Sequence, residues 1–141
     1  RNTPDQNRLE KVRARARSNG ISIVLHKRPD AREKETRLEV VCYKLPWRVI
    51  SPKNNWVLHR NSNRGWKSDM RGWQWSSGDA IKLRGTDVES VIDTMPDTVT
   101  AVILDRQGVG LIWTEVEGEE MVPLILEKLQ SLRSFFEKTF L

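Results

Sequence analysis

Seven stretches of the chain have the apolar spacing or the β-branched and aromatic content typical of strands. They are 21–26, 36–45, 47–50, 55–60, 80–83, 98–105 and 109–117. The turn Arg106-Gln107-Gly108 separates the last two, so 98–117 is predicted to form a β-hairpin. Residues 61–69 are polar and contain glycine, which predicts a long exposed loop.

Three other stretches have helical spacing. Thr3, Pro4 and Gln6 predict a capped helix start, and Asn19-Gly20 predicts its end. A second capping box, Thr86 to Glu89, precedes a short helix over 88–95. The third helix is predicted over 119–140. Its apolar stripe is Val122, Ile125, Leu129, Leu132, Phe136 and Phe140. Such a stripe either covers a face of the sheet or forms a dimer seam, and packing in the core is the favoured outcome.

These elements predict an α+β fold. The expected architecture is a mainly antiparallel sheet of short strands, with a basic N-terminal helix, a short inserted helix and a long C-terminal amphipathic helix packed on one sheet face. Residues 1–20 are expected to form a basic helix or arm, and 21–141 a single domain. The chain begins at Arg1 rather than Met, which is consistent with a domain of a longer protein.

Charge is distributed unevenly along the chain. Residues 1–84 contain 20 Lys and Arg against 8 Asp and Glu, whereas 85–141 contain 4 against 11. One interpretation is a polar charge field that steers an anionic partner to one face. The alternative is that the two parts neutralise each other within one fold.

The stretch 47–75 holds five of the six tryptophans, interleaved with six cations and only one acid, Asp69. Aromatic faces beside cations suit a polyanion that also has faces to stack on, so the sequence predicts a nucleic-acid-binding domain. DNA is slightly favoured over RNA, and single strands, junctions or ends over regular duplex. The residues predicted to contact nucleic acid are Arg13, Arg15, Arg17, Lys27, Arg28, Trp56, Arg60, Arg64, Trp66, Lys67, Arg71 and Trp73. The tryptophans are expected to stack on bases and the cations to bind phosphates.

Two other interpretations remain open. The basic, Trp- and Arg-rich part could be a protein-interaction module that docks an acidic partner within a larger complex. Sugar stacking would explain the tryptophans but not the number of arginines. A homo-oligomer through the C-terminal helix is a further possible assembly.

The sequence gives little indication of catalysis or of metal binding. His26 and His59 have no nucleophile motif or metal-ligand spacing around them, so no catalytic residue, metal or other cofactor is expected, and the protein is not expected to be an enzyme. Cys42 is the only cysteine and lies in an apolar run, which favours an intracellular protein. No apolar run approaches the length of a membrane span, and no membrane partner or signal peptide is expected.

Overall fold

The computed structural model describes residues 2–31, 39–49, 51–60 and 62–140. Seven strands form one antiparallel sheet in the order β1-β2-β7-β6-β3-β5-β4. The strands are β1 (Ser22–Lys27), β2 (Glu39–Leu45), β3 (Trp56–His59), β4 (Trp66–Lys67), β5 (Gln74–Ser77), β6 (Val99–Asp105) and β7 (Gly108–Trp113). The helices are α1 (Pro4–Ser18), α2 (Glu89–Asp93), the 3-10 turn η1 (Glu119–Met121) and α3 (Val122–Phe140). The predicted α+β class and antiparallel sheet are confirmed.

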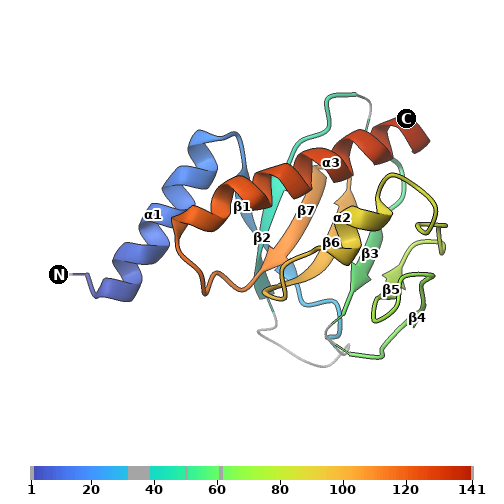
Figure 1. Ribbon diagram of the computed structural model, residues 1–141, viewed down its shortest axis with the longest axis horizontal. Helices are drawn as coiled ribbons and strands as arrows, with labels where there is room; N and C mark the ends of the chain where they lie inside the picture. Colours follow the sequence, from blue (N-terminus) through green and yellow to red (C-terminus); the bar gives the residue numbers. More distant parts are fainter. Residues whose placement is uncertain (1, 32–38, 50, 61, 141) are drawn as a thin grey trace.

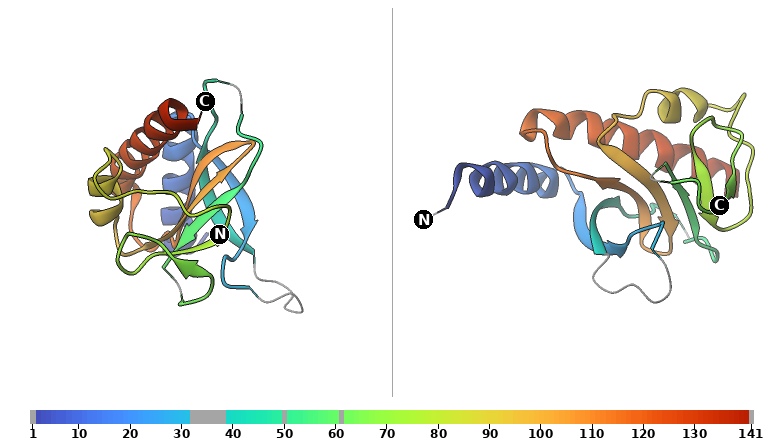
Figure 2. Two further views of the ribbon diagram at one scale, coloured as in Figure 1. Left: turned by 90° about the vertical axis from the view of Figure 1, so that its right-hand side faces the viewer. Right: turned by 90° about the horizontal axis from the view of Figure 1, so that it is seen from below.

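The helices lie on one side of the sheet, as Figure 1 and the left view of Figure 2 show. Helix α3 crosses the sheet diagonally, with α2 beside its C-terminal half, and α1 projects from the body near the start of α3. The predicted capping box of α1 is present, because Thr3 and Gln6 exchange side-chain to backbone hydrogen bonds of 2.8 and 3.1 Å. Nowhere in the described part of the chain is there a helix long and apolar enough to cross a membrane.

The apolar stripe of α3 packs against the sheet. Ile125, Leu129 and Leu132 are fully buried, and Phe136 is 4% exposed. They share one cluster with sheet residues that include Trp113. Core packing of this helix, the favoured outcome of the sequence analysis, is therefore what the structure shows. Phe140, the last member of the stripe, is different because it remains 37% exposed.

A second, smaller apolar cluster lies on the opposite face of the sheet. Successive side chains of a strand point to opposite faces, so Cys42 and Ile112 face away from the main core that Tyr43 and Leu111 enter. Cys42 is fully buried, and burial raises the pKa of its thiol to about 12. The cysteine is therefore a small hydrophobic core residue rather than a reactive thiol.

Some element predictions were wrong. Residues 80–83 form no strand, because the backbone amides of Leu83 and Arg84 both donate to the carboxylate of Asp69 at 2.9 Å instead of pairing with a strand. Helix α2 starts without a side-chain cap because its N-cap residue is Val88; the Thr86 hydroxyl lies two residues earlier and accepts from the Val88 amide at 3.3 Å. The helix is also shorter than expected.

Of two other predicted strands, one is absent and one is described only in part. Residues 47–49 do not form a strand, because their polar groups bond to β6 and α3, as described below. The predicted strand 36–45 is confirmed as β2 over 39–45, while 36–38, like Ile50 of the stretch 47–50, lie outside the described residues. Within the predicted exposed loop 61–69 the structure adds the two-residue strand β4, and Asn61 is outside the described residues.

Candidate binding site

Two of the arginines on α1 that were predicted to bind phosphate bond within the protein. Arg13 donates to both carboxylate oxygens of Glu115, at 2.8 and 2.9 Å. Arg15 donates to the backbone carbonyl of Glu119 at 3.2 Å. These bonds tie α1 to the segment between β7 and α3. Arg17, the third predicted residue on this helix, is exposed.

Arg60 and Trp73, also predicted contacts, are used together inside the fold. The guanidinium of Arg60 lies 4.6 Å from the ring centroid of Trp73 and donates to the carbonyls of Val99, at 2.8 Å, and Pro96. Trp73 is only 4% exposed. Burial lowers the pKa of Arg60. This pair fixes the entry to β6, and its aromatic face is covered.

The remaining predicted cations do not gather on one surface with α1. Trp66 and Lys67 form β4, at the far edge of the sheet from β1, and Trp66 is 45% exposed. Arg71 is exposed in the turn that follows. Because α1 lies beside β1, the helix and the Trp66 edge are at opposite ends of the sheet.

A single acid joins two other predicted residues. The carboxylate of Asp30 pairs with Arg28 at 2.6 Å, and its backbone carbonyl accepts a hydrogen bond from Arg64 at 3.4 Å. The structure thus brings Arg28 and Arg64 together, as part of the fold. Lys27, at the end of β1, is exposed.

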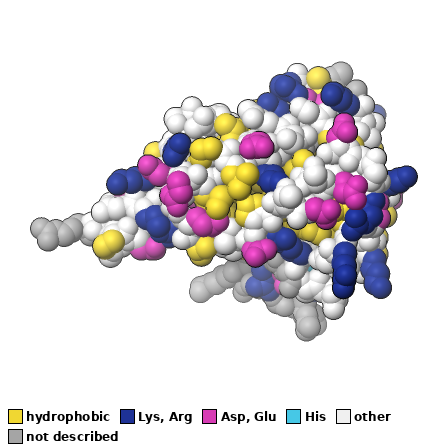
Figure 3. Space-filling view, viewed as in Figure 1, with side chains coloured by type: hydrophobic (Ala, Val, Ile, Leu, Met, Phe, Trp, Pro, Cys, Tyr) yellow, Lys and Arg dark blue, Asp and Glu magenta, His cyan; other side chains and the backbone are white. Residues whose placement is uncertain are grey.

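The basic first part of the chain and the acidic remainder neutralise each other by ion pairs across the fold. Arg13 pairs with Glu115, Lys44 with Asp105, and Arg48 with Glu137. Figure 3 shows basic and acidic side chains on the same face of the molecule. The arrangement favours the interpretation of mutual neutralisation over that of a steering field.

Glu115 is the centre of a buried network that includes one of these pairs. The side chain, 6% exposed, accepts from Arg13 and, at 2.5 Å, from the hydroxyl of Tyr43. Burial alone would raise the pKa of Glu115, but the hydrogen bonds from Arg13 and Tyr43 and the charges of Arg13 and Arg8 outweigh it, so the pKa lies below its ordinary value. Glu115 has a φ of +59°, a left-handed conformation that this bonding holds in place.

The histidines make local contacts. His59 is fully buried, with Nε2 2.9 Å from the carbonyl of Arg64, and Nδ1 of His26 lies 2.7 Å from the carbonyl of Lys27. Among the residues that the structure describes, no group of three or more His, Cys, Asp and Glu side chains could hold a metal ion.

An open apolar site forms where the loop between β2 and β3 meets the end of α3. Pro46 ends β2, and Trp47 anchors the loop by donating its indole N–H to the carbonyl of Asp105 at 2.6 Å. The backbone amide and guanidinium of Arg48 both donate to the carboxylate of Glu137 on α3, at distances from 2.6 to 3.0 Å. Trp47 and Arg48 are therefore held in place, and the next residue, Val49, is 51% exposed.

Aromatic rings form the wall of this site. Phe140 stacks on Trp56 with ring centroids 5.2 Å apart, and on Phe136 at 5.9 Å. A Cβ atom at Gly78, which has a φ of +82°, would collide with the Trp56 ring, so the glycine makes room for it. We call the hollow bounded by Val49, Pro52, Trp56 and Phe140 the aromatic notch.

The aromatic notch has an open volume of about 600 Å³, within the usual size of small-molecule sites. Ser51, Lys53 and Asn54 supply polar groups to its lining. Beneath it the packing around Trp47 and Leu104 leaves only about 10 Å³, so the open space lies along the rings and not between the strands.

Sequence reasoning included Trp56 but missed Val49, Pro52 and Phe140. Phe140 was assigned to the core stripe, and only the packing shows that the stripe extends past the sheet. The available signal was an apolar residue, Val49, between two cations in a proline-bounded loop.

No family model and no curated protein matches this sequence. Among solved structures, the chain is similar to the mycobacterial trehalose monomycolate transport factor A, TtfA, with a TM-score of 0.55. The match covers 90% of this chain and 93% of that chain at 10% sequence identity. At this identity the likeness shows the fold.

This comparison corrects the prediction of a nucleic-acid-binding domain, which was wrong. The structure that shares the fold is a transport factor and not a DNA- or RNA-binding protein. The physical reason for the error is visible in the contacts: Arg13, Arg15 and Arg60 were counted as free cations, but each bonds inside the fold. Trp73 was counted as a stacking face but is buried.

Proposed function

We propose that this chain is a non-enzymatic lipid-binding domain that serves a transport system and holds the acyl chain of a single lipid in the aromatic notch. The observation that carries the proposal is the stack of half-buried Trp56 on exposed Phe140 beside Val49, around a hollow of about 600 Å³. Apolar side chains in a rigid concave site favour an apolar guest, because binding removes both surfaces from water.

The fixed frame of the notch supports ligand binding over accidental exposure. Arg48 and Trp47 anchor the loop on two different elements, α3 and β6. Residues held in this way lose little conformational freedom on binding, so more of their apolar contact contributes to affinity.

The rim of the notch indicates an amphiphile. Lys53 is exposed at the rim, where its ammonium group can pair with a carboxylate or another anionic group at the head of the ligand. Asn54 and Ser51 add hydrogen-bonding groups beside it. A purely apolar guest would use none of these groups.

The shared fold supports a role in transport. The name of the similar protein describes a transport factor for trehalose monomycolate, a lipid built from a sugar and a fatty acid. An accessory domain in such a system needs to hold a lipid rather than to transform it.

The test is a titration of the protein with a dansyl-labelled undecanoic acid below its micelle concentration, followed by the rise in dansyl fluorescence. We expect a dissociation constant of roughly 1–100 μM, because the notch is shallow. Phe140→Ala should weaken binding about tenfold through lost apolar contact. Lys53→Glu should weaken it about threefold, since an exposed charge pair contributes little.

Leu25→Ala is the matched control. Leu25 is 65% exposed on β1, outside the aromatic notch, so this variant should bind like the wild type. Equal losses in the Phe140 and Leu25 variants, or no rise in fluorescence at all, would refute the proposal. Binding to vesicles of phosphatidylglycerol without binding to the monomeric probe would refute it too, in favour of docking on a bilayer.

A further inference from the structure

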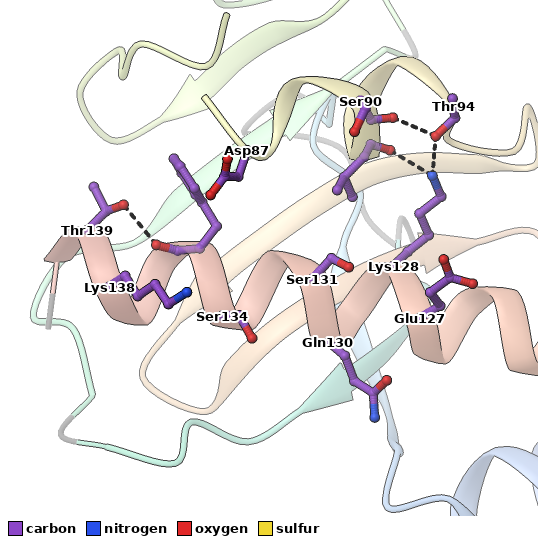
Figure 4. Close-up of a pocket in the computed structure, with 12 residues that line it drawn as sticks. Asp87, Ser90, Thr94, Glu127, Lys128, Gln130, Ser131, Ser134, Lys138 and Thr139 are labelled. Atoms are coloured by element: carbon purple, nitrogen blue, oxygen red, sulfur yellow. Dashed lines mark hydrogen bonds between the residues drawn. The ribbon is translucent and has the colours of Figure 1, made fainter. Parts of the chain in front are cut away.

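A second hollow lies on the outer side of α3, between this helix and α2. It has an open volume of about 670 Å³, and it is lined by some of the residues between 87 and 94 in the α2 region and between 127 and 139 on α3. Figure 4 shows side chains of both elements around it, and we call it the polar groove. The last turns of α3 contribute to both sites: Phe135 and Thr139 line the polar groove, and Phe140, which stacks on Phe136, lines the aromatic notch.

Polar side chains without internal partners gather in the polar groove. Within the described part of the chain, Asp87, Gln130 and Ser131 make no side-chain hydrogen bond or ion pair, and all three are exposed. By contrast, Asp69 accepts two backbone amides, and Glu137 is bonded to Arg48. The groove therefore offers both donors and acceptors to a ligand.

The walls of the polar groove are fixed by a buried lysine. Lys128, 7% exposed, donates from α3 to the hydroxyl of Thr94 and, at 3.1 Å, to the carbonyl of Val91 (Figure 4). Burial lowers the pKa of Lys128. Because the ammonium group bonds at the C-terminal end of α2, it holds the two helices at a set separation.

The charges of the polar groove are balanced. Asp87 and Glu127 contribute two negative charges, and Lys128 and Lys138 two positive ones. A balanced groove gives no net attraction to phosphate or to a carboxylate. Phe135, half-buried, adds an aromatic surface. Hydroxyls, an amide and one ring together fit an uncharged ligand that carries many hydroxyl groups.

We propose that the polar groove is a binding site for a neutral carbohydrate group. Hydroxyls of the sugar would bond with Ser131, Gln130 and Asp87, and its apolar face would lie on Phe135. The polar groove is distinct from the aromatic notch, and the proposal rests on the residues of the groove alone. It therefore goes beyond the proposed lipid binding. If both sites act, their ligand is a glycolipid whose head and acyl chain lie on opposite sides of the end of α3.

The test is a titration of ¹⁵N-labelled protein with trehalose, followed by two-dimensional ¹H-¹⁵N NMR spectra. The sugar has no acyl chain, so its outcome does not depend on the aromatic notch. We expect amide shifts in residues 87–94 and 127–139, with a dissociation constant of roughly 1–10 mM. The double variant Gln130→Ala with Ser131→Ala should weaken binding about tenfold, through two lost hydrogen bonds.

Ser22→Ala, an exposed hydroxyl on β1, is the matched control and should leave the trehalose titration unchanged. Parallel titrations use inorganic phosphate and a capped Gly-Ser peptide. No shift with trehalose, or shifts unaffected by the double variant, would overturn the proposal. Shifts in the same residues with phosphate or the peptide and none with trehalose would assign the groove to an anion or to a protein segment instead.

Discussion

The two ends of α3 differ in how their side chains are used. At its start, the segment that leads into the helix carries Glu115, whose carboxylate is buried and bonded to Arg13 and Tyr43. At its end, Phe140 and Val49 are exposed around an open hollow. At the first end, the buried charge of Glu115 is bonded to partners within the protein. At the last end, the apolar side chains are exposed around the open hollow.

This difference separates stability from binding. Buried charge requires partners inside the protein, because an unpaired charge in a low dielectric is strongly unfavourable. Exposed aromatic rings contribute less to folding, and they become useful when a ligand covers them. We therefore assign the Glu115 network to the fold and the aromatic notch to function. The following predictions test that separation.

The largest effect is expected at the buried end. Glu115→Gln removes the charge that Arg13 and Tyr43 face, and we expect the free energy of unfolding to fall by about 2–3 kcal/mol. Urea unfolding measures it. Glu119→Gln, a change of an exposed side chain, is the control and should stay within about 0.5 kcal/mol of wild type. Binding of the acyl probe by the folded Glu115 variant should be unchanged, and a loss of binding would show that the two ends are coupled.

A smaller effect is expected from pH. The pKa of Glu115 is lower in the folded protein than its ordinary value of 4.5, so its contribution to stability is complete above that value and is lost as the pH falls below it. The stability difference between wild type and Glu115→Gln should therefore shrink on acidification. Urea unfolding of both proteins from about pH 7 to about pH 3 measures the difference. A constant difference would mean that Glu115 is not held ionised by its partners.

The smallest effect is expected at the exposed tryptophan on the sheet edge. Trp66→Ala removes a ring that is 45% exposed and lies outside the aromatic notch. We expect stability to change by less than about 0.5 kcal/mol and acyl binding to stay the same. Thermal unfolding and the dansyl titration check the two expectations. A large loss of acyl binding would place the lipid site at β4 instead.

Much of the fold could be predicted, because local rules and burial agree over its regular elements. The hairpin 98–117 contains β6 and β7, and the period of Ile125, Leu129 and Leu132 gave α3 and its buried face. The errors fall where a side chain from a distant segment takes the backbone bonds. Asp69 binds the amides of Leu83 and Arg84 from 14 and 15 residues away, and no local pattern contains that information.

The candidate site could be predicted only in part. The concentration of tryptophan in 47–75 does mark the region of the aromatic notch, through Trp47 and Trp56. Whether these tryptophans indicate binding of nucleic acid depends on which nearby cations lack a partner inside the fold. That is decided by pairs such as Arg48 with Glu137, which are 89 residues apart. The polar groove had no signal at all, because it arises from the distance between α2 and α3. The intracellular location and the absence of cofactors stay predictions.

The short length of β4 affects how readily the protein aggregates in concentrated solution. An edge strand exposes unpaired backbone groups to which a neighbouring molecule can add its own strand, which is a common start of aggregation. Here the sheet ends in only two residues, Trp66 and Lys67, and one of them is charged. Because this edge is short and charged, an incoming strand has few backbone groups to pair with. Fibrous self-association from this side of the molecule is therefore disfavoured.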